Sequence, residues 1–373
     1  MADHSNRMQY LVIIPTYNEI RNIGRIIPEV LKQDQRIDIL VVDDKSPDGT
    51  AEVVEKLLKK KTCNKRVNLI KRSGKLGLGT AYRDGFIWGL KKNYDYFISM
   101  DADFSHSPAA LGEMIELSRQ NPSMIILGSR YVKGGKIVNW DFKRYFNSHI
   151  ANWATRLLLG TRAKDSTAGF KCYPKEFIKK INLKSLVASG YAFQVEMLFL
   201  AKEKGFSIKE FPITFMDRKD GVSKVGGELK RSTWIVLRLA FRRRIVRQFI
   251  KFGVVGATCS LIDWAVFFGI KLLTGWEIQY LKQITKGISF IVSATFSYIL
   301  NRTWTFRSTE QAVAKQASLF FVVATIGLGL NNLIFYLVTG IFGWPDIAGL
   351  VITTTIVMFW NFTANKILVF KDI

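Results

Sequence analysis

The chain has 373 residues, of which 48% are hydrophobic and 23% are charged, and its 54 Lys and Arg against 30 Asp and Glu give a formal net charge of +24. Its 27 Phe, 12 Tyr and 9 Trp supply enough apolar area to exclude a disordered chain, and three cysteines without a CxxC spacing exclude a disulfide framework and a structural zinc site. The length predicts two or three domains. Residues 1–8 are polar, and we expect them to be a disordered start.

The excess positive charge is concentrated in one short segment. Residues 1–216 contain 35 basic and 22 acidic residues, residues 217–251 contain 11 and 3, and residues 252–373 contain 8 and 5. A basic segment beside apolar helices suits an anionic membrane surface, whereas a protein that binds duplex nucleic acid has no reason for this placement. The pattern therefore favours a lipid bilayer, and not nucleic acid, as the partner.

Short β-branched segments alternate with helical segments in the first 214 residues. We expect strands at 10–14, 37–42, 67–71, 96–100 and 124–128, and helices at 23–32, 50–60, 79–91 and 108–119. This alternation predicts an α/β domain with a mostly parallel sheet covered on both faces. Ligands of such sheets bind beyond the carboxyl ends of the strands. The site is therefore expected after Ile14, Val42 and Met100.

Residues 228–248 alternate apolar side chains with Lys and Arg at helical spacing. The pattern predicts amphipathic helices at 227–248 that lie in the lipid headgroup layer. The alternative is a soluble helix that packs on the preceding domain.

From Phe252 onward the chain is strongly apolar. A bilayer core needs about 20 apolar residues per helix, and we predict four transmembrane helices at about 250–272, 284–304, 316–342 and 346–367. The second and fourth end in a repeated sequence, Asn301-Arg302-x-x-x-Phe306 and Asn365-Lys366-x-x-x-Phe370. Each half is then a helical hairpin that returns to one side. Because basic residues flank that side, the positive-inside rule places the N-terminal domain and both chain ends in the cytoplasm.

The strongest chemical signal is Met100-Asp101-Ala102-Asp103, directly after the fourth predicted strand. Two carboxylates separated by one residue can bind a hard divalent cation, which neutralises a diphosphate. The same sequence also occurs in ordinary turns, where the side chains accept backbone hydrogen bonds. Both interpretations stay open for the pair on its own.

Aromatic and polar residues follow the other strands. Tyr17, after the first strand, offers a ring for base stacking, and Asp44, after the second, can accept hydrogen bonds from a nucleobase or a ribose hydroxyl. We interpret Ser46 and Asp48 as a helix cap and a turn. The glycines of the segment 74–80 either bring the backbone near a nucleotide or simply begin a helix.

Absent motifs exclude several functions. The sequence has no GxGxxG after its first strand and no GxxxxGKS, so dinucleotide-binding and P-loop sites do not fit. Its three histidines, at positions 4, 106 and 149, form no evident Ser/His/Asp arrangement, which argues against a hydrolase.

Taken in order, these motifs resemble a known family. From about Leu11 to Lys230 the chain is similar to the family 2 glycosyltransferases, and within that family to the dolichol-phosphate mannose synthases. This family has the GT-A fold, which is the α/β fold of nucleotide-diphospho-sugar transferases with a Rossmann-like mixed sheet. The matching blocks are residues 15–19, 42–48, 76–82, 100–104, 128–131, 165–170, 190–196 and 223–224. The resemblance implies a GT-A catalytic domain at 9–226. It also implies an inverting transfer of mannose from GDP-mannose to dolichyl or another polyprenyl phosphate, which gives dolichyl β-D-mannosyl phosphate and GDP. The implied cofactor is Mg²⁺ or Mn²⁺.

The resemblance also implies site residues. The guanosine would be held by Pro15, Tyr17, Glu19, Val42 and Asp44. Asp101 and Ala102 would line the diphosphate, and Asp103, with Asp101, would bind the metal. Ser105 stands where some relatives have a metal-binding Gln, so it would bind the metal directly or through water. Positions near the donor phosphates of the family are matched by Arg130, Arg218 and Lys224. The acceptor-phosphate pocket is matched by Arg130, Arg144 and Ser148. The alternative for any single arginine is a solvated surface charge.

Residues 249–373 resemble the GtrA-type membrane domain that is fused to some prokaryotic members. This implies a multi-pass protein in the cell membrane of a prokaryote. For the all-α membrane domain, anchoring, placement of the acceptor and contacts in a homo-oligomer stay open as roles.

The implied reaction agrees with the residues present. A lipid phosphate is already anionic near neutral pH, so it attacks the sugar C1 without a protein base. Catalysis then depends on position and charge, with Asp101, Asp103, Arg130 and Arg144 as the catalytic residues. Two alternatives stay open: a polyprenyl-phosphate glucosyltransferase that uses UDP-glucose, and a lipid-sugar translocator with a silent transferase domain. The sequence has no Gln-x-x-Arg-Trp, which argues against a processive polysaccharide synthase.

Overall fold

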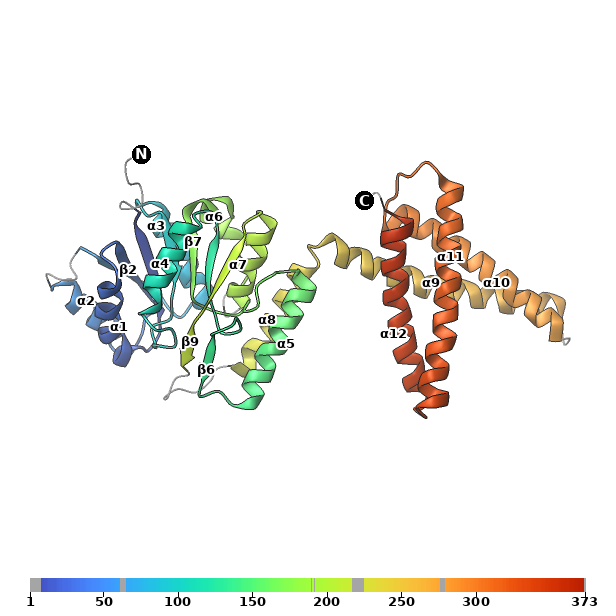
Figure 1. The fold of residues 1–373 in the computed structure, drawn as a ribbon, viewed down its shortest axis with the longest axis horizontal. Coiled ribbons are helices and arrows are strands. Elements are labelled where there is room, and N and C mark those ends of the chain that lie inside the picture. Colours follow the sequence, from blue (N-terminus) through green and yellow to red (C-terminus); the bar gives the residue numbers. More distant parts are fainter. Residues whose placement is uncertain are drawn as a thin grey trace. The chain divides into compact units, whose positions relative to one another are not determined.

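The computed structural model describes residues 8–60, 65–188, 190, 192–216, 225–275 and 279–371. The predicted start at 1–8, apart from Met8, lies outside the described residues, as do Arg218 and Lys224. The chain divides into two compact units, Met1–Ala240 and Phe241–Ile373 (Figure 1).

A seven-stranded sheet forms the centre of the first unit. Its strand order is β3-β2-β1-β4-β7-β5-β8. The strands are β1 (Tyr10–Thr16), β2 (Ile37–Asp43), β3 (Val67–Lys71), β4 (Tyr96–Ser99), β5 (Ile125–Ser129), β7 (Lys171–Pro174) and β8 (Ile208–Pro212). The first five lie within two residues of the predicted strands. In β1 and β2 nearly every side chain is buried, as central strands covered on both faces require.

The sheet is mixed, because one inserted strand reverses direction. β1 pairs in parallel with β2 and β4, β2 with β3, and β5 with β8. β7 lies between β4 and β5 and runs antiparallel to both. A separate two-stranded sheet pairs β6 (Lys136–Val138) with β9 (Thr214–Met216). The sequence did not predict β6 to β9, which have three to five residues each.

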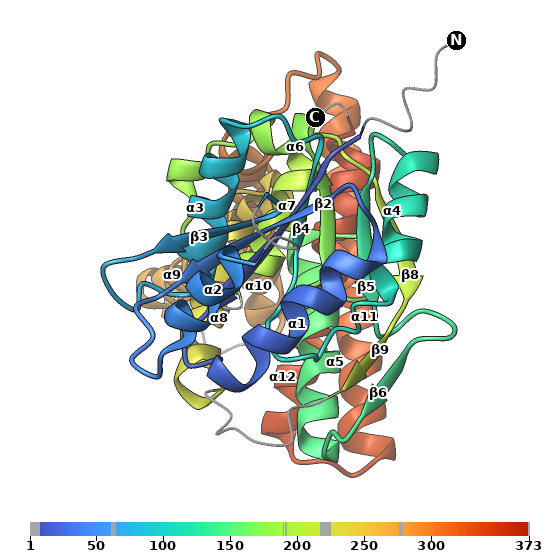
Figure 2. The ribbon, with the colours of Figure 1, turned by 90° about the vertical axis from the view of Figure 1, so that its left-hand side faces the viewer.

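Helices cover both faces of the sheet, as predicted. On one face lie α1 (Ile20–Gln33), α2 (Thr50–Leu58) and α4 (Ala110–Gln120), whose buried side chains share a core with β1 and β2. On the other lie α3 (Leu78–Leu90), α6 (Lys175–Lys180) and α7 (Ala192–Glu203). Phe86 of α3 packs against Phe97, Tyr173 and Phe193 of that second core. Figure 2 shows α3 and α4 on opposite sides of the strands.

Two further helices complete the first unit, together with the single turn η2 (Leu183–Ser185). α5 (Phe142–Leu159) begins at Asp141, whose side chain accepts a hydrogen bond from the backbone nitrogen of Arg144, and ends at Gly160 in the left-handed conformation. α8 (Val225–Ala240) packs against α5 and α7. The predicted amphipathic segment 227–248 therefore consists of most of α8 and the first turn of the next helix. Its place in the headgroup layer stays a prediction.

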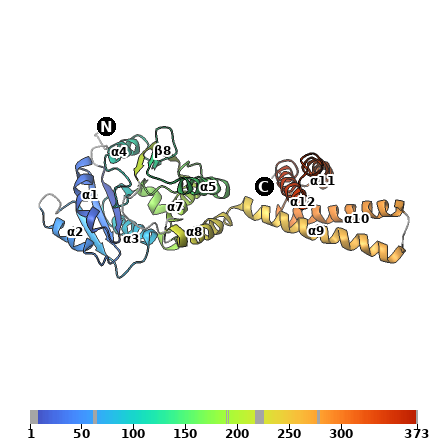
Figure 3. The ribbon, with the colours of Figure 1, turned by 90° about the horizontal axis from the view of Figure 1, so that it is seen from below.

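The second unit contains four helices in its described residues. They are α9 (Arg244–Thr274), α10 (Gln279–Leu300), α11 (Val313–Tyr336) and α12 (Asp346–Ala364), and π-helical turns follow the last three at η3 (Asn301–Thr305), η4 (Leu337–Ile341) and η5 (Asn365–Val369). Figure 3 shows α10 beside α9 and α12 beside α11. Three segments, Arg244–Thr274, Val313–Ile341 and Asp346–Val369, are long and apolar enough to cross a membrane. Lysines and serines make α10 less apolar, so the second predicted span, at 284–304, stays a prediction.

The predicted repeat has a structural counterpart in η3 and η5. The backbone nitrogen of Phe306 donates to the carbonyl of Asn301, and that of Phe370 donates to the carbonyl of Asn365, both at 2.8 Å. The rings of Phe306 and Phe370 stack with their centres 4.6 Å apart and their planes at 16°. The repeated sequence is therefore confirmed as a repeated structure, and its two copies meet.

The contacts around this stack are reciprocal. Phe252 of α9 lies 5.7 Å from Phe362 of α12, and Phe320 of α11 lies 5.5 Å from Tyr298 of α10, measured between ring centres. Likewise, Lys366 donates to Gln248 of α9 at 3.3 Å, and Arg302 donates to Gln316 of α11. Gln248-x-x-x-Phe252 and Gln316-x-x-x-Phe320 are a second part of the repeat, which the sequence analysis missed. Each hairpin thus binds the other through equivalent residues, as parallel repeats do.

These reciprocal pairs lead to a stability prediction. Gln316→Leu and Gln248→Leu are each expected to cost about 1–3 kcal/mol, because each leaves a basic side chain without its acceptor. The loss is larger for Gln316, which also donates to Ser308 at 2.9 Å and to the carbonyl of Val369 at 3.0 Å. The thermal midpoint of the full chain in lipid nanodiscs measures both. The control is Gln283→Leu, at an exposed position of α10, and a wild-type midpoint for Gln316→Leu would contradict the role of these pairs.

Candidate active site

The carboxyl ends of β1, β2 and β4 meet at one edge of the sheet. The register pairs Pro15 with Val42 and Ile13 with Ser99. Beyond the strands, the backbone nitrogen of Asp44 donates to the carbonyl of Thr16 at 3.0 Å, and that of Met100 donates to the carbonyl of Ile13 at 3.2 Å. The structure therefore brings the predicted nucleotide-binding segments and the Asp101-Ala102-Asp103 sequence to adjacent strand ends.

Asp44 is buried and holds the loop that contains the glycines. Its Oδ1 accepts a hydrogen bond from Arg72 Nη1 at 2.5 Å, and its Oδ2 accepts from the backbone nitrogens of Leu76 and Gly77 at 3.1 and 3.0 Å. Arg72 also binds Thr80 at 2.6 Å and Asp84 at 3.1 Å. Gly77 has a φ of +99°, a conformation that favours glycine. The loop 74–80 is thus fixed beside β2, and Arg72 is a site residue that no sequence motif indicated.

Two predicted guanosine residues, Tyr17 and Glu19, follow β1, and Tyr17 lies against this loop. The ammonium of Lys75 is 4.0 Å from the ring centre of Tyr17. Glu19 is buried, and its carboxylate accepts from Asn22 at 2.9 Å while its backbone nitrogen donates to Thr50 at 2.9 Å. The backbone nitrogen and the hydroxyl of Thr50 both donate to Asp48, which confirms the predicted turn at Asp48.

Asp101 and Asp103 follow β4 as half-buried side chains. Oδ1 of Asp103 accepts from the backbone nitrogen of Ser105 at 3.0 Å, so the turn interpretation holds for one oxygen of that carboxylate. Ala102 and Ser105 are each 3% exposed, and the carbonyl of Ser105 accepts from the backbone nitrogen of Met216 at 3.3 Å. Phe104 between them has a φ of +61°, which is rare for a bulky residue and turns the chain.

A buried histidine stands behind this pair. Nδ1 of His106 lies 3.8 Å from Oδ2 of Asp101 and has no hydrogen-bond partner among the described residues. The imidazole packs against Phe170 and Phe215, and its burial lowers the pKa of His106 to about 4, so it is neutral at neutral pH. The carboxylates of Asp101 and Asp103 supply the kind of oxygen ligand that a hard divalent cation prefers. Within the described residues, no group of three or more acidic, His or Cys side chains could hold a metal ion.

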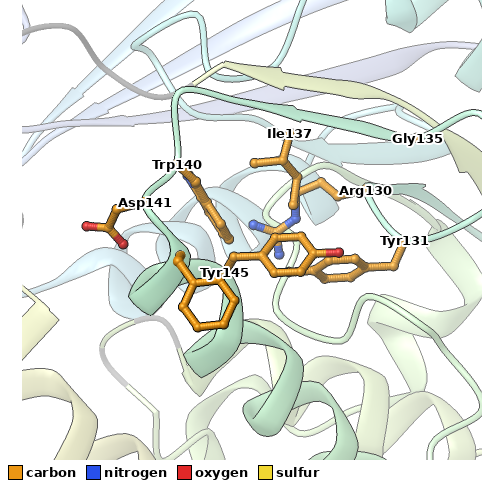
Figure 4. A pocket seen from close by; sticks show the side chains of 8 residues that line it. Arg130, Tyr131, Gly135, Ile137, Trp140, Asp141 and Tyr145 are labelled. Atoms are coloured by element: carbon orange, nitrogen blue, oxygen red, sulfur yellow. The ribbon is translucent and has the colours of Figure 1, made fainter.

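A cavity of about 420 Å³ lies beside β6 and the start of α5. Its lining is Arg130, Tyr131, Gly135, Ile137, Trp140, Asp141, Phe142 and Tyr145. Figure 4 shows the guanidinium of Arg130 among the rings of Trp140, Tyr131 and Tyr145. Its central carbon lies 5.1 Å from the ring centre of Trp140, 5.3 Å from that of Tyr131 and 5.2 Å from that of Phe215. The cavity is therefore an aromatic recess with a fixed cation in its wall.

Asp165 holds that cation in place. Arg130 donates from Nε and Nη2 to the two oxygens of Asp165 at 2.7 and 2.6 Å, and from Nη2 to Thr167 at 2.8 Å. Burial raises the pKa of Asp165, but the hydrogen bonds and the charge of Arg130 outweigh burial and lower that pKa below its ordinary value. The pair is thus ionised and almost wholly buried. Asp165 lies in a block that matches the family, but no role was predicted for it from the sequence.

The other predicted acceptor residues line the same region. The guanidinium of Arg144 lies 4.8 Å from the ring centre of Trp140, and Ser148, one turn further along α5, accepts a hydrogen bond from the Tyr131 hydroxyl at 2.7 Å. Arg130, Arg144 and Ser148 are therefore linked through two rings of one cavity. The sequence did not single out Trp140 or Tyr131, since a lone aromatic residue carries no motif.

Comparisons with known proteins identify the family of the chain. Residues 11–181 match glycosyl transferase family 2, and residues 251–370 match the GtrA/DPMS transmembrane domain. The chain is 41% identical to the polyprenol monophosphomannose synthase of Mycolicibacterium smegmatis over 64% of this chain and 89% of that protein. It is 40% identical to the undecaprenyl-phosphate mannosyltransferase of Micrococcus luteus over 59% of this chain and 88% of that protein.

A solved structure of the glucosyl-3-phosphoglycerate synthase of Mycobacterium tuberculosis, in complex with Mn²⁺ and UDP-glucose, is similar over 63% of this chain and 80% of that chain, with 14% identity and a TM-score of 0.48. The family assignment follows from the sequence relatives, which the chain covers almost completely, and from the two matched domains. The chain belongs to the family 2 glycosyltransferases and carries a GtrA/DPMS transmembrane domain.

Proposed function

We propose that the protein transfers mannose from GDP-mannose to dolichyl or another polyprenyl phosphate at the cytoplasmic face of a membrane. The product is dolichyl β-D-mannosyl phosphate, and GDP leaves. The observation that carries the proposal is the cavity with the fixed cation Arg130, which lies beside an exposed apolar helix face. The names of the two sequence relatives, a polyprenol monophosphomannose synthase and an undecaprenyl-phosphate mannosyltransferase, support it.

The donor side is formed by the strand ends. Pro15, Tyr17, Glu19, Val42 and Asp44 are proposed to hold the guanosine, with Asp44 acting through the loop 74–80 that it binds. Arg218 and Lys224, outside the described residues, are proposed to contact the donor phosphates. Tyr17 and Lys75 already form a flat cationic surface, which suits a purine base and its phosphates.

Asp101 and Asp103 are proposed to hold Mg²⁺ or Mn²⁺, and Ala102 to line the diphosphate. When bound, the cation supplies positive charge that stabilises the departing diphosphate. Because the described residues provide two carboxylates and no larger acidic cluster, oxygens of the donor phosphates are expected to complete the coordination, with Ser105 contributing at most through water.

The acceptor side uses fixed charge and no base. Arg130 is oriented by Asp165 before any ligand binds, so little reorganisation is needed when a phosphate arrives. Arg144 and Ser148 are proposed to bind the same phosphate from α5. The phosphate is anionic near neutral pH and attacks the sugar C1 directly. Attack opposite the leaving diphosphate inverts the anomeric carbon and gives the β linkage.

An apolar face on α5 suits a lipid acceptor. Its apolar side chains recur at spacings of three or four residues: Phe142, Phe146, Ile150, Trp153 and Leu157, which are 81%, 53%, 48%, 60% and 61% exposed. Phe142 also lines the cavity. An isoprenoid tail beside this face would stay in the bilayer while its phosphate reaches Arg130. We therefore propose that the face contacts the lipid acyl boundary.

The first test is a donor and acceptor panel with Asp103→Ala. Full-length protein with Mn²⁺ is expected to give mannosyl polyprenyl phosphate from GDP-mannose, and the variant to lose roughly 100-fold or more of the turnover, because the diphosphate loses its counter-charge. Product mass spectrometry measures both. Glu176→Ala, at an exposed position of α6, is the control. Product from UDP-glucose instead would replace the donor assignment, and full turnover by Asp103→Ala would refute the metal role.

The second test concerns the α5 face. The double variant Phe146→Ser and Trp153→Ser is expected to raise the KM for a long-chain polyprenyl phosphate in vesicles roughly 10-fold, because apolar contact with lipid is lost. The KM for a short, water-soluble isoprenyl phosphate is expected to stay unchanged. Asn147→Ser, exposed on the same helix, is the matched control. Equal KM changes for the two acceptors would contradict a membrane-facing role.

A further inference from the structure

One segment, Asp165 to Lys171, joins the two proposed substrate sites. At its start, Asp165 holds Arg130 in the cavity wall. Towards its end, Gly169 lies against the carboxylate that follows β4, since a Cβ atom on Gly169 would come within 3.3 Å of Oδ2 of Asp101. A shift of this segment would therefore change the geometry of both sites. The contacts that hold its two parts in place thus matter for the reaction.

The two ends have different anchors. The hydroxyl of Ser99 donates to the carbonyl of Gly169 at 2.6 Å, which ties the donor-side end to β4. On the acceptor side, the amine of Lys171 donates to the carbonyl of Ala168 and to Oε1 of Gln194 in α7, the latter at 2.8 Å. Lys171 thus links the part of the segment next to Asp165 to a helix on the far face of the sheet.

Burial of the Lys171 amine costs free energy of desolvation. The residue is wholly buried, and Gln194 is 1% exposed. Burial lowers the pKa of Lys171 to about 7, although the charge of Asp165 acts in the opposite direction. The other charged groups that act on it are Arg130, Asp101 and Glu210. An apolar side chain would fill the same space without the cost of desolvating an amine. Packing alone therefore does not explain a lysine here.

We propose that Lys171 is a positioning residue of the transferase reaction: by tying the Ala168 carbonyl to Gln194, it sets the Asp165–Arg130 pair toward the acceptor phosphate. The proposal rests on the proposed function, in which Arg130 binds that phosphate. Because Ser99 anchors Gly169 separately, loss of Lys171 should disturb the acceptor side and spare the donor side. Asp165 and Ser166 keep further bonds to Glu210 and Asn152, so the segment should not unfold.

Steady-state kinetics of Lys171→Met in the full-length protein tests this. The acceptor KM is expected to rise about 5- to 10-fold and kcat to fall, because a misplaced Arg130 binds the nucleophile poorly. The donor KM and the affinity for GDP should stay within about two-fold of the wild type. Lys179→Met, an exposed lysine of α6, is the matched control. An equal rise in the donor KM would overturn the proposal in favour of a general structural role.

Two further variants keep the test decisive. Gln194→Leu removes the same link from the other side, so it should reproduce the acceptor effect, and the double variant should be no worse than either single one. In an Arg130→Lys background, Lys171→Met should add nothing, because the residue acts through Arg130. Additive effects in either combination would overturn the proposal. If Lys171→Met does not fold, Gln194→Leu carries the measurement.

Hydrogen exchange separates this proposal from the proposed function. In Lys171→Met, backbone amides of residues 165–169 should exchange faster while those of β1 are unchanged, whatever the substrate is. If wild-type protein transfers no mannose to any polyprenyl phosphate, the proposed function fails, and the exchange result still decides whether Lys171 fixes the segment. Unchanged exchange at 165–169 would overturn the role of Lys171.

Discussion

The buried ion pair between Arg130 and Asp165 is the interaction on which the proposed acceptor site depends. A guanidinium without water is stable here because a carboxylate binds two of its nitrogens and three rings surround it. A lysine could not replace it, since an ammonium is a compact charge that offers no planar fork. The pair holds the buried guanidinium in one orientation in the cavity wall, and burial makes attraction to a phosphate stronger than in water.

The reversed strand β7 explains how the segment that contains Asp165 reaches the proposed donor site. Parallel strands end at the same edge of a sheet, and an antiparallel strand begins there. Because β7 starts at Lys171, opposite Ser99 at the end of β4, the segment before β7 lies beside the carboxylate of Asp101, which follows β4. An all-parallel sheet would have brought the end of a strand to this place instead. The mixed topology is therefore a condition of the site and not an incidental feature of the fold.

Sequence patterns were sufficient for the parts of the protein in which local chemistry decides the structure. The β-branched segments predicted five strands, and the rule for parallel strands predicted that the segments after Ile14, Val42 and Met100 meet at one edge of the sheet. The mixed direction of the sheet, the Asp44–Arg72 contact and the Asp165–Arg130 pair depend on residues 28 and 35 positions apart, and no local pattern indicates such partners. The expected roles of Arg144 and Ser148 came from the resemblance to a family, because spacing alone gave no reason for them.

The reciprocal contacts between the two hairpins have a consequence for the evolution of the second unit. The stacked rings of Phe306 and Phe370 lie at η3 and η5, at the ends of the two hairpins. The reciprocal hydrogen bonds of Lys366 and Arg302 lie at the same ends. In the first hairpin, Asp263 forms an ion pair with Lys286 at 2.6 Å and accepts a hydrogen bond from Ser289 at 2.7 Å. Counted from the repeated residues, Asn331 of the second hairpin corresponds to Asp263, and Leu350 corresponds to Lys286. The second hairpin therefore lacks this ion pair. A duplicated element of this kind can specialise one copy while both copies keep the surface that joins them.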